Sequence, residues 1–168
     1  PSPFVAGAVI DLDGTPKLVL DVEKLHEEAP RLGRNTVEPV WKRHRLLVID
    51  DSLTTRTLQE NILGSAGFSV QLASSGEEGL QALEESSFSL ILVDVEMPGI
   101  DGFTFIERLR EGPHAHLPVI LVTSRNSSED KARASQVGVQ GYIVKSEFTP
   151  RILLHTVHSL LVPQVHPL

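Results

Sequence analysis

From residue 45 onward, short apolar segments alternate with longer segments in which apolar and polar residues mix at helical spacing. Three of the apolar segments are almost continuously hydrophobic, which is typical of strands buried on both faces of a parallel sheet. Alternating strands and helices predict an α/β fold with right-handed crossovers and helices on both faces of that sheet. The expected strands are Arg45–Ile49, Ser69–Leu72, Leu90–Val93, Val119–Val122 and Tyr142–Val144.

The segments between the expected strands begin with residues that commonly cap helices. Ser52, Ser75 and Ser127 each precede a mixed segment, where a serine side chain can accept a hydrogen bond from a free backbone N–H group. Gly64 or Gly67 is expected to end the first helix. The positions expected to face the core include Leu53, Leu58 and Ile62 in the first helix, Ala132 and Val137 in the fourth, and Phe148, Ile152, Leu153, Val157, Leu160 and Leu161 in the last.

The first 25 residues follow a different pattern, with two apolar runs on either side of Asp13-Gly14. This pattern predicts an antiparallel hairpin, because glycine tolerates the positive φ that a tight turn requires. A two-stranded hairpin is only marginally stable alone, so we interpret it as the edge of a larger domain. Residues 26–44 are polar and without period, and we interpret them as a linker. Because the chain begins at proline, we expect a fragment of a longer protein.

The composition is that of an ordinary globular protein, with 40% hydrophobic and 22% charged residues. The net charge of −7 argues against a nucleic-acid partner, which would require clustered lysine and arginine. The absence of cysteine excludes disulfides, thiolate metal sites and a cysteine nucleophile. No apolar run approaches the roughly 20 residues needed to span a bilayer, and no signal peptide is recognisable. We therefore expect a cytoplasmic protein without membrane insertion.

Polar residues suited to chemistry follow four of the expected strands. Asp50 and Asp51 come after the first strand, Asp94 after the third, Thr123 at the end of the fourth, and Lys145 after the fifth. The carboxyl ends of parallel strands meet at one edge of a sheet, where α/β proteins bind their ligands. Any one of these residues would be ordinary near a helix N-terminus, but the five together indicate a site.

Three neighbouring carboxylates repel one another, and a divalent cation relieves that repulsion. A set of oxygen ligands without histidine or cysteine suits Mg²⁺. Lys145 supplies a positive charge and Thr123 a hydrogen-bond donor for an incoming anion. A carboxylate can attack phosphorus to give an aspartyl phosphate, a reaction that depends mainly on positioning and charge neutralisation. The pattern therefore predicts phosphoryl transfer onto an aspartate.

Residues 45–162 resemble the receiver domain of two-component response regulators. The resemblance rests on the order and spacing of segments along the chain. It implies a flavodoxin-like, three-layer fold with a five-stranded parallel sheet in the order 2-1-3-4-5. The segments that carry it are Leu47–Ser52, Leu92–Gly102, Val122–Ser124 and Gly141–Lys145.

The resemblance implies a role for each acidic residue at the predicted edge. Asp94 would accept the phosphoryl group and contribute to the Mg²⁺ site. Asp51 would ligate Mg²⁺ directly, and Asp50 would act largely through water. The backbone carbonyl of Glu96 would be a further metal ligand. The residue type at this position varies within the family. The carboxylate of Glu96 would alter the affinity for the metal or the lifetime of the phosphoryl group.

The resemblance also implies a conformational switch. Lys145 would pair with the phosphoryl group, Thr123 would donate a hydrogen bond to it, and the aromatic ring of Tyr142 would turn inward when Thr123 moves. A phosphoryl group adds about −1.5 to −2 charge and three strong acceptors, enough to bias a loop between two arrangements. Ser146 departs from the family pattern, since many receivers have a cis proline there, and this puts the geometry of the loop after Lys145 in question.

The implied phosphoryl donor is the phospho-histidine domain of a histidine kinase, in the same chain or in a partner. The segments Gly7–Ile10, Asp13-Gly14 and Leu18–Val22 are similar to the closing hairpin of the CheW-like coupling domain. Together with the receiver pattern they suggest the C-terminal part of a hybrid CheA-type chemotaxis kinase, with chemotaxis coupling or motility proteins as further partners. The implied organisation is a hairpin remnant at 1–25, a linker at 26–44, a receiver at 45–162 and a tail at 163–168. This fragment would have at most self-phosphotransfer and dephosphorylation activity.

The sequence suggests two alternatives to a phosphorylated receiver, of which we reject the first. The segment Ile10–Thr15 matches the nucleophile motif of haloacid-dehalogenase-like phosphatases, which would make Asp11 a nucleophile and Asp13 a general acid. We reject this reading, because such an enzyme needs a doubly wound sheet after the motif and only residues 16–44 precede the next domain. The second alternative is a receiver fold that is never phosphorylated and serves only as a docking module.

Overall fold

The computed structural model describes residues 5–10, 16–20 and 44–161, and for the first two of these ranges only the backbone. The chain divides into two units, residues 1–37 and 38–168. In the first unit, strands β1 (Val5–Ile10) and β2 (Pro16–Leu20) pair antiparallel, as the two apolar runs predict. The predicted turn at Asp13-Gly14 lies outside the described residues. Among the described residues, no helix is both long and apolar enough to cross a membrane.

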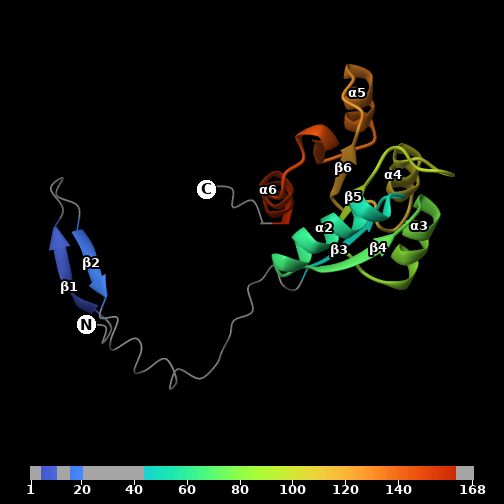
Figure 1. Ribbon diagram of the computed structural model, residues 1–168. Helices are drawn as coiled ribbons and strands as arrows, with labels where there is room; N and C mark the ends of the chain where they lie inside the picture. The colour runs from blue at the N-terminus through green and yellow to red at the C-terminus, as the bar shows by residue number, and fades with distance from the viewer. Residues whose placement is uncertain (1–4, 11–15, 21–43, 162–168) are drawn as a thin grey trace. The chain divides into compact units, whose positions relative to one another are not determined.

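The second unit is built on a five-stranded sheet whose neighbouring strands are all parallel. The strand order is β4-β3-β5-β6-β7, which is the predicted order 2-1-3-4-5 when the strands of this unit are counted alone. The predicted fold class is therefore confirmed. The strands are β3 (Arg45–Ile49), β4 (Ser69–Ala73), β5 (Leu90–Val93), β6 (Val119–Thr123) and β7 (Gly141–Val144) (Figure 1).

Helices cover both faces of this sheet and enclose two separate cores. Strand β3 is continuously apolar because its alternate side chains are buried on opposite faces of the sheet. Leu47 and Ile49 pack in one core, and Leu46 and Val48 pack in the other. Helices α3, α4 and α5 contribute to the first core, whereas α2 and α6 contribute to the second. The helices are α2 (Leu53–Ser65), α3 (Gly76–Glu85), α4 (Gly102–Glu111), α5 (Ser128–Gln136) and α6 (Pro150–Leu161), with a short 3₁₀ turn, η2 (Lys145–Glu147), before α6.

The three predicted serine caps are present. The hydroxyl groups of Ser52, Ser75 and Ser127 accept hydrogen bonds from N–H groups in the first turns of α2, α3 and α5. Asp101, which the sequence analysis did not single out, caps α4 in the same way, with Oδ1 2.8 Å from the backbone N of Thr104. Gly67, with φ of 95°, follows the end of α2, so of the two candidate glycines it is the one outside the helix.

The predicted core face of α2 is wrong at two positions. Leu53 is 68% exposed and Leu58 is 48% exposed, whereas Gln59 and Leu63 are buried. Gln59 and Leu63 are four residues apart and lie on one face, so the helix is rotated to bury that pair instead of its first two leucines. The choice of buried face depends on how the helix packs against the sheet, and hydrophobicity alone does not determine it.

The predicted apolar faces of two later helices also need correction. In α5, Ala132 is exposed and Ala134 is the buried residue. Phe148 precedes α6 and is not part of it, because the Thr149 hydroxyl accepts a hydrogen bond from the backbone N of Ile152 and the helix begins at Pro150. Proline is common at this first helical position, since its missing N–H would have no partner within the helix.

Arg110 stabilises the loops at the end of the sheet opposite the predicted site. Its guanidinium donates hydrogen bonds to the carbonyl oxygens of Ala115 and Leu117 at 2.7 Å, ahead of β6. It also donates to the carbonyl oxygens of Gly138 at 2.6 Å and Val137 at 3.4 Å, ahead of β7. One side chain at the end of α4 therefore holds two separate loops, although burial lowers the pKa of Arg110 from its usual value.

Candidate functional site

Three aspartates meet at the carboxyl edge of the sheet. One carboxylate oxygen from each of Asp50, Asp51 and Asp94 lies within 4.8 Å of the others. Asp50 and Asp94 are buried, with exposed fractions of 1% and 3%, whereas Asp51 is exposed. The predicted convergence of these three residues is therefore found in the structure.

The parallel pairing of β3 with β5 explains why Asp50 and Asp94 are adjacent. Ile49 is in register with Val93, so the next residue of each strand emerges at the same edge. The backbone N of Asp94 donates to the carbonyl oxygen of Ile49 at 2.9 Å. Each side chain is then oriented by its own loop: Asp50 Oδ1 accepts a hydrogen bond from the backbone N of Ser52 at 2.8 Å. Likewise, Asp94 Oδ1 accepts one from the backbone N of Glu96 at 3.3 Å.

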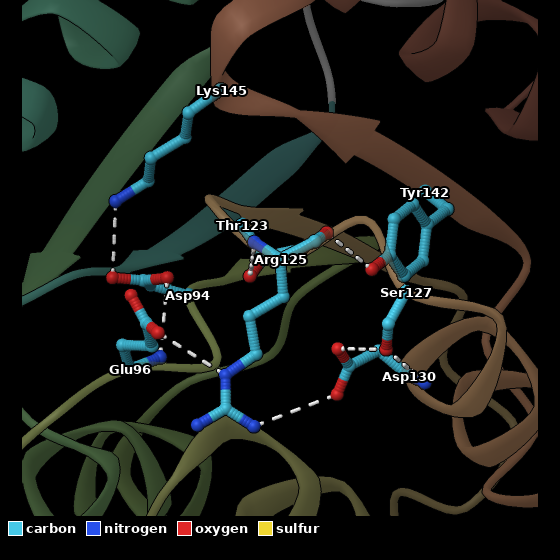
Figure 2. A network of polar contacts seen from close by, with 8 residues as sticks. All are labelled: Asp94, Glu96, Thr123, Arg125, Ser127, Asp130, Tyr142 and Lys145. Atoms are coloured by element: carbon cyan, nitrogen blue, oxygen red, sulfur yellow. Dashed lines mark hydrogen bonds and ion pairs between the residues drawn. The ribbon is translucent and has the colours of Figure 1, made fainter.

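Lys145 extends from the end of β7 to the two buried carboxylates. Its Nζ atom lies 3.0 Å from Asp50 Oδ2 and 3.0 Å from Asp94 Oδ2. The Lys145 side chain is 26% exposed, so it is only partly shielded from solvent. Figure 2 shows its contact with Asp94 and the residues on the other side of that carboxylate.

The electrostatics of this group favour a bound cation. Burial raises the pKa of Asp94, and the nearby charge of Asp50 raises it further, although Lys145 opposes both effects. Burial alone would lower the pKa of Lys145, but its hydrogen bonds to Asp50 and Asp94 outweigh that effect and raise it, so the ammonium stays charged. Three carboxylates and one ammonium leave the pocket with excess negative charge. The all-oxygen donor set of Asp50, Asp51 and Asp94 could hold a hard divalent cation such as Mg²⁺.

Thr123 and Tyr142 lie beside this cluster and share a different partner. Thr123 is fully buried, and its Oγ1 accepts a hydrogen bond from the backbone N of Arg125 at 3.1 Å. Tyr142 is partly buried, and its hydroxyl donates to the backbone O of Arg125 at 2.6 Å. Burial raises the pKa of Tyr142, so the phenol keeps this proton. Both predicted switch residues therefore form hydrogen bonds to the backbone of the same loop residue, Arg125 (Figure 2).

Arg125 is a residue of this region that no motif in the sequence predicted. Its Nε lies 3.1 Å from Glu96 Oε1, and its Nη1 lies 3.5 Å from Asp130 Oδ1. The signal that could have identified it is positional: Arg125 follows the predicted strand end at Thr123 by two residues, and Glu96 follows Asp94 by two. Equivalent positions after neighbouring parallel strands are close in space.

The loop after Lys145 has ordinary backbone geometry. No peptide bond in the described part of the chain is cis, and the bond between Lys145 and Ser146 lies in that part. The chain instead forms the 3₁₀ turn Lys145–Glu147 before α6. The side chain of Lys145 reaches both aspartates from this turn, so Ser146 is compatible with the predicted position of the ammonium group.

Replacing Asp94 with asparagine is expected to stabilise the protein without divalent cations, and to do so only at higher pH. Because the pKa of Asp94 is raised in the folded protein, the wild type loses stability as the pH rises from the usual carboxyl value near 3.8 through the folded value. We expect Asp94→Asn to raise the free energy of unfolding near neutral pH by about 1–2 kcal/mol. The gain should vanish when the wild-type carboxyl is protonated in both states.

Urea unfolding from about pH 3 to about pH 8 in a chelator measures this difference. Asp51→Asn provides the control, because it removes the same charge from an exposed position. It should stabilise the protein less than half as much. A pH-independent gain in Asp94→Asn would contradict the assignment of the effect to a buried charge.

Comparisons with known proteins agree with this geometry. Residues 46–158 match the response regulator receiver domain family. The chain is 35% identical over 161 residues to the gliding motility regulatory protein of Myxococcus xanthus, covering 95% of this chain and 21% of that protein. It is 42% identical over 100 residues to the transcriptional regulatory protein AfsQ1 of Streptomyces coelicolor, covering 60% of this chain and 44% of that protein. The chain thus spans less than half the length of these relatives.

The fold comparison gives the same result for the second unit. The chain is similar to the chemotaxis protein CheY4 of Vibrio cholerae, with a TM-score of 0.67 and 33% identity over 70% of this chain and 98% of that one. It is also similar to a response regulator structure from Chloroflexus aurantiacus, with a TM-score of 0.67 and 34% identity over 70% and 97% of the two chains.

Proposed function

The chain belongs to the response regulator receiver family, whose members accept phosphoryl groups in two-component signalling, and we propose that Asp94 is the acceptor. The observation that carries the proposal is the contact between Lys145 and Asp94. A buried carboxylate at a strand end lies 3.0 Å from an ammonium group, beside two further carboxylates. This arrangement provides a nucleophile, a positive charge for the incoming phosphoryl group and ligands for a divalent cation.

The proposed reaction is an in-line displacement at phosphorus. A carboxylate oxygen of Asp94 forms the new P–O bond while the P–N bond of a kinase phospho-histidine breaks, and the bonding electron pair leaves with the imidazole. Lys145 pairs with the phosphoryl oxygens. Asp50, Asp51, Asp94 and the backbone carbonyl of Glu96 would hold Mg²⁺, which when bound neutralises the charge of the transferring group.

The switch that we propose uses Thr123 and Tyr142. The Thr123 hydroxyl lies at the carboxyl end of β6, and turning toward a phosphoryl group would break its contact with the backbone N of Arg125. That same residue accepts the hydrogen bond from Tyr142 through its carbonyl oxygen. A rearrangement at Thr123 would therefore reach Tyr142 through one peptide segment.

Incubation with a small phosphoryl donor and Mg²⁺, followed by intact mass measurement, tests the proposal. We expect the wild type to gain one phosphoryl group and Asp94→Asn to gain none, and a chelator should abolish the gain. Asp101→Asn is the matched control, because asparagine also caps helices and α4 should remain intact. An equal gain in Asp94→Asn would overturn the assignment. No gain in the wild type would favour the docking module instead.

We further propose that the receiver belongs to a longer protein of the hybrid CheA type, with residues 1–25 as the end of a CheW-like domain and residues 26–44 as a linker. Support comes from the antiparallel pairing of β1 with β2. Support also comes from the Myxococcus xanthus relative, whose similarity extends over 161 residues and so beyond the receiver. A chain that includes the preceding domains should transfer a phosphoryl group from ATP to Asp94, and failure of such transfer would contradict this context. The phosphatase hypothesis is not favoured, and Asp11 lies outside the described residues.

A further inference from the structure

Arg125 joins two parts of the molecule that the acceptor chemistry does not connect. Its guanidinium contacts Glu96, in the loop after β5, and Asp130, in the first turn of α5. Glu96 in turn bonds to the acceptor, because its backbone N donates to Asp94 Oδ1. Figure 2 shows the resulting series of contacts from Lys145 through Asp94, Glu96 and Arg125 to Asp130.

The Asp130 end of this series lies in the first turn of α5 and contacts the capping residue Ser127. The Asp130 carboxylate accepts a hydrogen bond from the Ser127 hydroxyl. The backbone N of Asp130 donates a hydrogen bond to Ser127 Oγ at 3.1 Å. Ala134 is the one buried residue of α5, and Arg133 adds a contact with the Phe103 ring, so the first turn of the helix itself has no buried side chain. A change at its first turn therefore meets little resistance from packing.

Both ion pairs of Arg125 are weak enough to exchange. The side chain of Arg125 is 47% exposed, and those of Glu96 and Asp130 are 49% and 18% exposed. The contact with Asp130, at 3.5 Å, is the longer of the two. Ion pairs that involve such an exposed arginine contribute little to stability. A phosphoryl group on Asp94 would add about −1.5 to −2 charge, with oxygens that a guanidinium can bind through two parallel hydrogen bonds. It would therefore compete successfully with Asp130.

We propose, on the basis of the acceptor role of Asp94 argued above, that Arg125 is a positioning residue that transmits the charge state of Asp94 to α5. Phosphorylation draws the guanidinium from Asp130 toward the phosphoryl group and loosens the first turn of α5. This route uses the side chain of Arg125, whereas Thr123 and Tyr142 contact only its backbone. The two routes can therefore be separated by substitution.

The test compares the wild type, Arg125→Gln and the control Arg133→Gln with and without phosphorylation. Arg133 is another exposed arginine, located in α5, 3.6 Å from Glu107 and with its guanidinium 4.4 Å from the centroid of the Phe103 ring. This control therefore removes a positive charge and a packing contact from α5 without touching the acceptor loop. Three quantities are measured in each protein: phosphoryl occupancy by intact mass, hydrogen exchange of the amides at the start of α5, and the ¹⁹F resonance of fluorotyrosine at Tyr142. That residue is the only tyrosine of the chain, so one signal reports the backbone route.

In the wild type and Arg133→Gln, phosphorylation is expected to speed exchange at the start of α5 about threefold, the effect of losing one exposed ion pair. In Arg125→Gln this exchange should already be fast before phosphorylation and should not change further. Asp130→Asn should behave in the same way, since it removes the other half of the pair. The ¹⁹F shift on phosphorylation should be the same in all four proteins.

The outcomes separate this inference from the acceptor assignment. A phosphorylated Arg125→Gln whose α5 exchange rises as much as that of the wild type would overturn the inference and leave Asp94 as the acceptor. A lost ¹⁹F response in Arg125→Gln would also overturn it, by showing that the side chain acts through Tyr142. A wild-type protein that gains no phosphoryl group would overturn both the role of Arg125 and the assignment of Asp94 as the acceptor.

Discussion

Gly102→Ala is expected to lower the free energy of unfolding by about 3 kcal/mol, as overpacking against immobile atoms does. A Cβ atom at Gly102 would press against the carbonyl oxygen of Asp94 and lie 2.9 Å from the carbonyl carbon of Asp94 and the Cα of Val95. All three are backbone atoms and cannot rotate away. The start of α4 is also tied to this loop by a hydrogen bond from the Gly102 N to the Val95 carbonyl oxygen at 3.0 Å. Relief of the clash would therefore displace the acceptor itself.

Urea unfolding of Gly102→Ala and Gly64→Ala measures this effect against a matched control. Gly64 lies inside α2, and a Cβ atom there would meet nothing within 4 Å. Alanine is a better helix former than glycine, so Gly64→Ala should be about 0.5–1 kcal/mol more stable than the wild type. Gly102→Ala with wild-type stability would show that α4 and the acceptor loop do not approach this closely.

Lys145→Met is expected to lower the free energy of unfolding by about 3 kcal/mol near neutral pH in a chelator, because it leaves two buried carboxylates without their cation. Methionine preserves most of the apolar stem, so the lost charge dominates the effect. The loss should shrink as the pH falls through the folded pKa of Asp94. That pKa is already raised in the wild type by burial, and protonation of Asp94 relieves the repulsion.

The same substitution in the Asp94→Asn background isolates the contact between the two side chains. With Asp94 neutral, Lys145 retains only Asp50 as a charged partner at hydrogen-bond distance, and the loss should fall by about half. Urea unfolding of the wild type, the two single variants and the double variant provides the complete double-mutant cycle. Equal losses in both backgrounds would mean that Lys145 does not stabilise the protein through Asp94, and would leave Asp50 as its effective partner.

Strands β3, β5 and β6 were predictable because burial on both faces leaves few alternatives for a short apolar segment. The bounds of β3 and β5 agree with the prediction, and β4, β6 and β7 each extend one residue further. Helix orientation was less predictable. The exposed Leu53 and the buried Gln59 show that a helix with mixed residues can bury a polar side chain when packing against the sheet favours another face.

The acidic part of the site was predictable because its residues lie directly at strand ends. Topology alone brings Asp50 and Asp94 together, and no side chain needs to reach far. Arg125 was not predictable in the same way. It lies in a loop, and its partners are fixed by the length and direction of its own side chain, which no periodicity in the sequence encodes.

The two ends of the sheet are expected to differ in their stability in acid, because Arg110 at the end of α4 holds one of them. Arg110 keeps its charge at every pH at which proteins remain folded, so the loops before β6 and β7 stay fastened in acid. At the opposite edge, hydrogen bonds from backbone N–H groups, including that of Ile100, lower the pKa of Glu77. The hydroxyl and N–H groups of Ser74 do the same for Glu78.

The stability that those two carboxylates provide is present above their usual pKa and is lost as the pH falls through the lowered one. Below the usual carboxyl pKa, acidification should therefore weaken the contacts of Glu77 and Glu78 at the edge that carries the candidate site, whereas the contacts of Arg110 at the opposite end of the sheet persist.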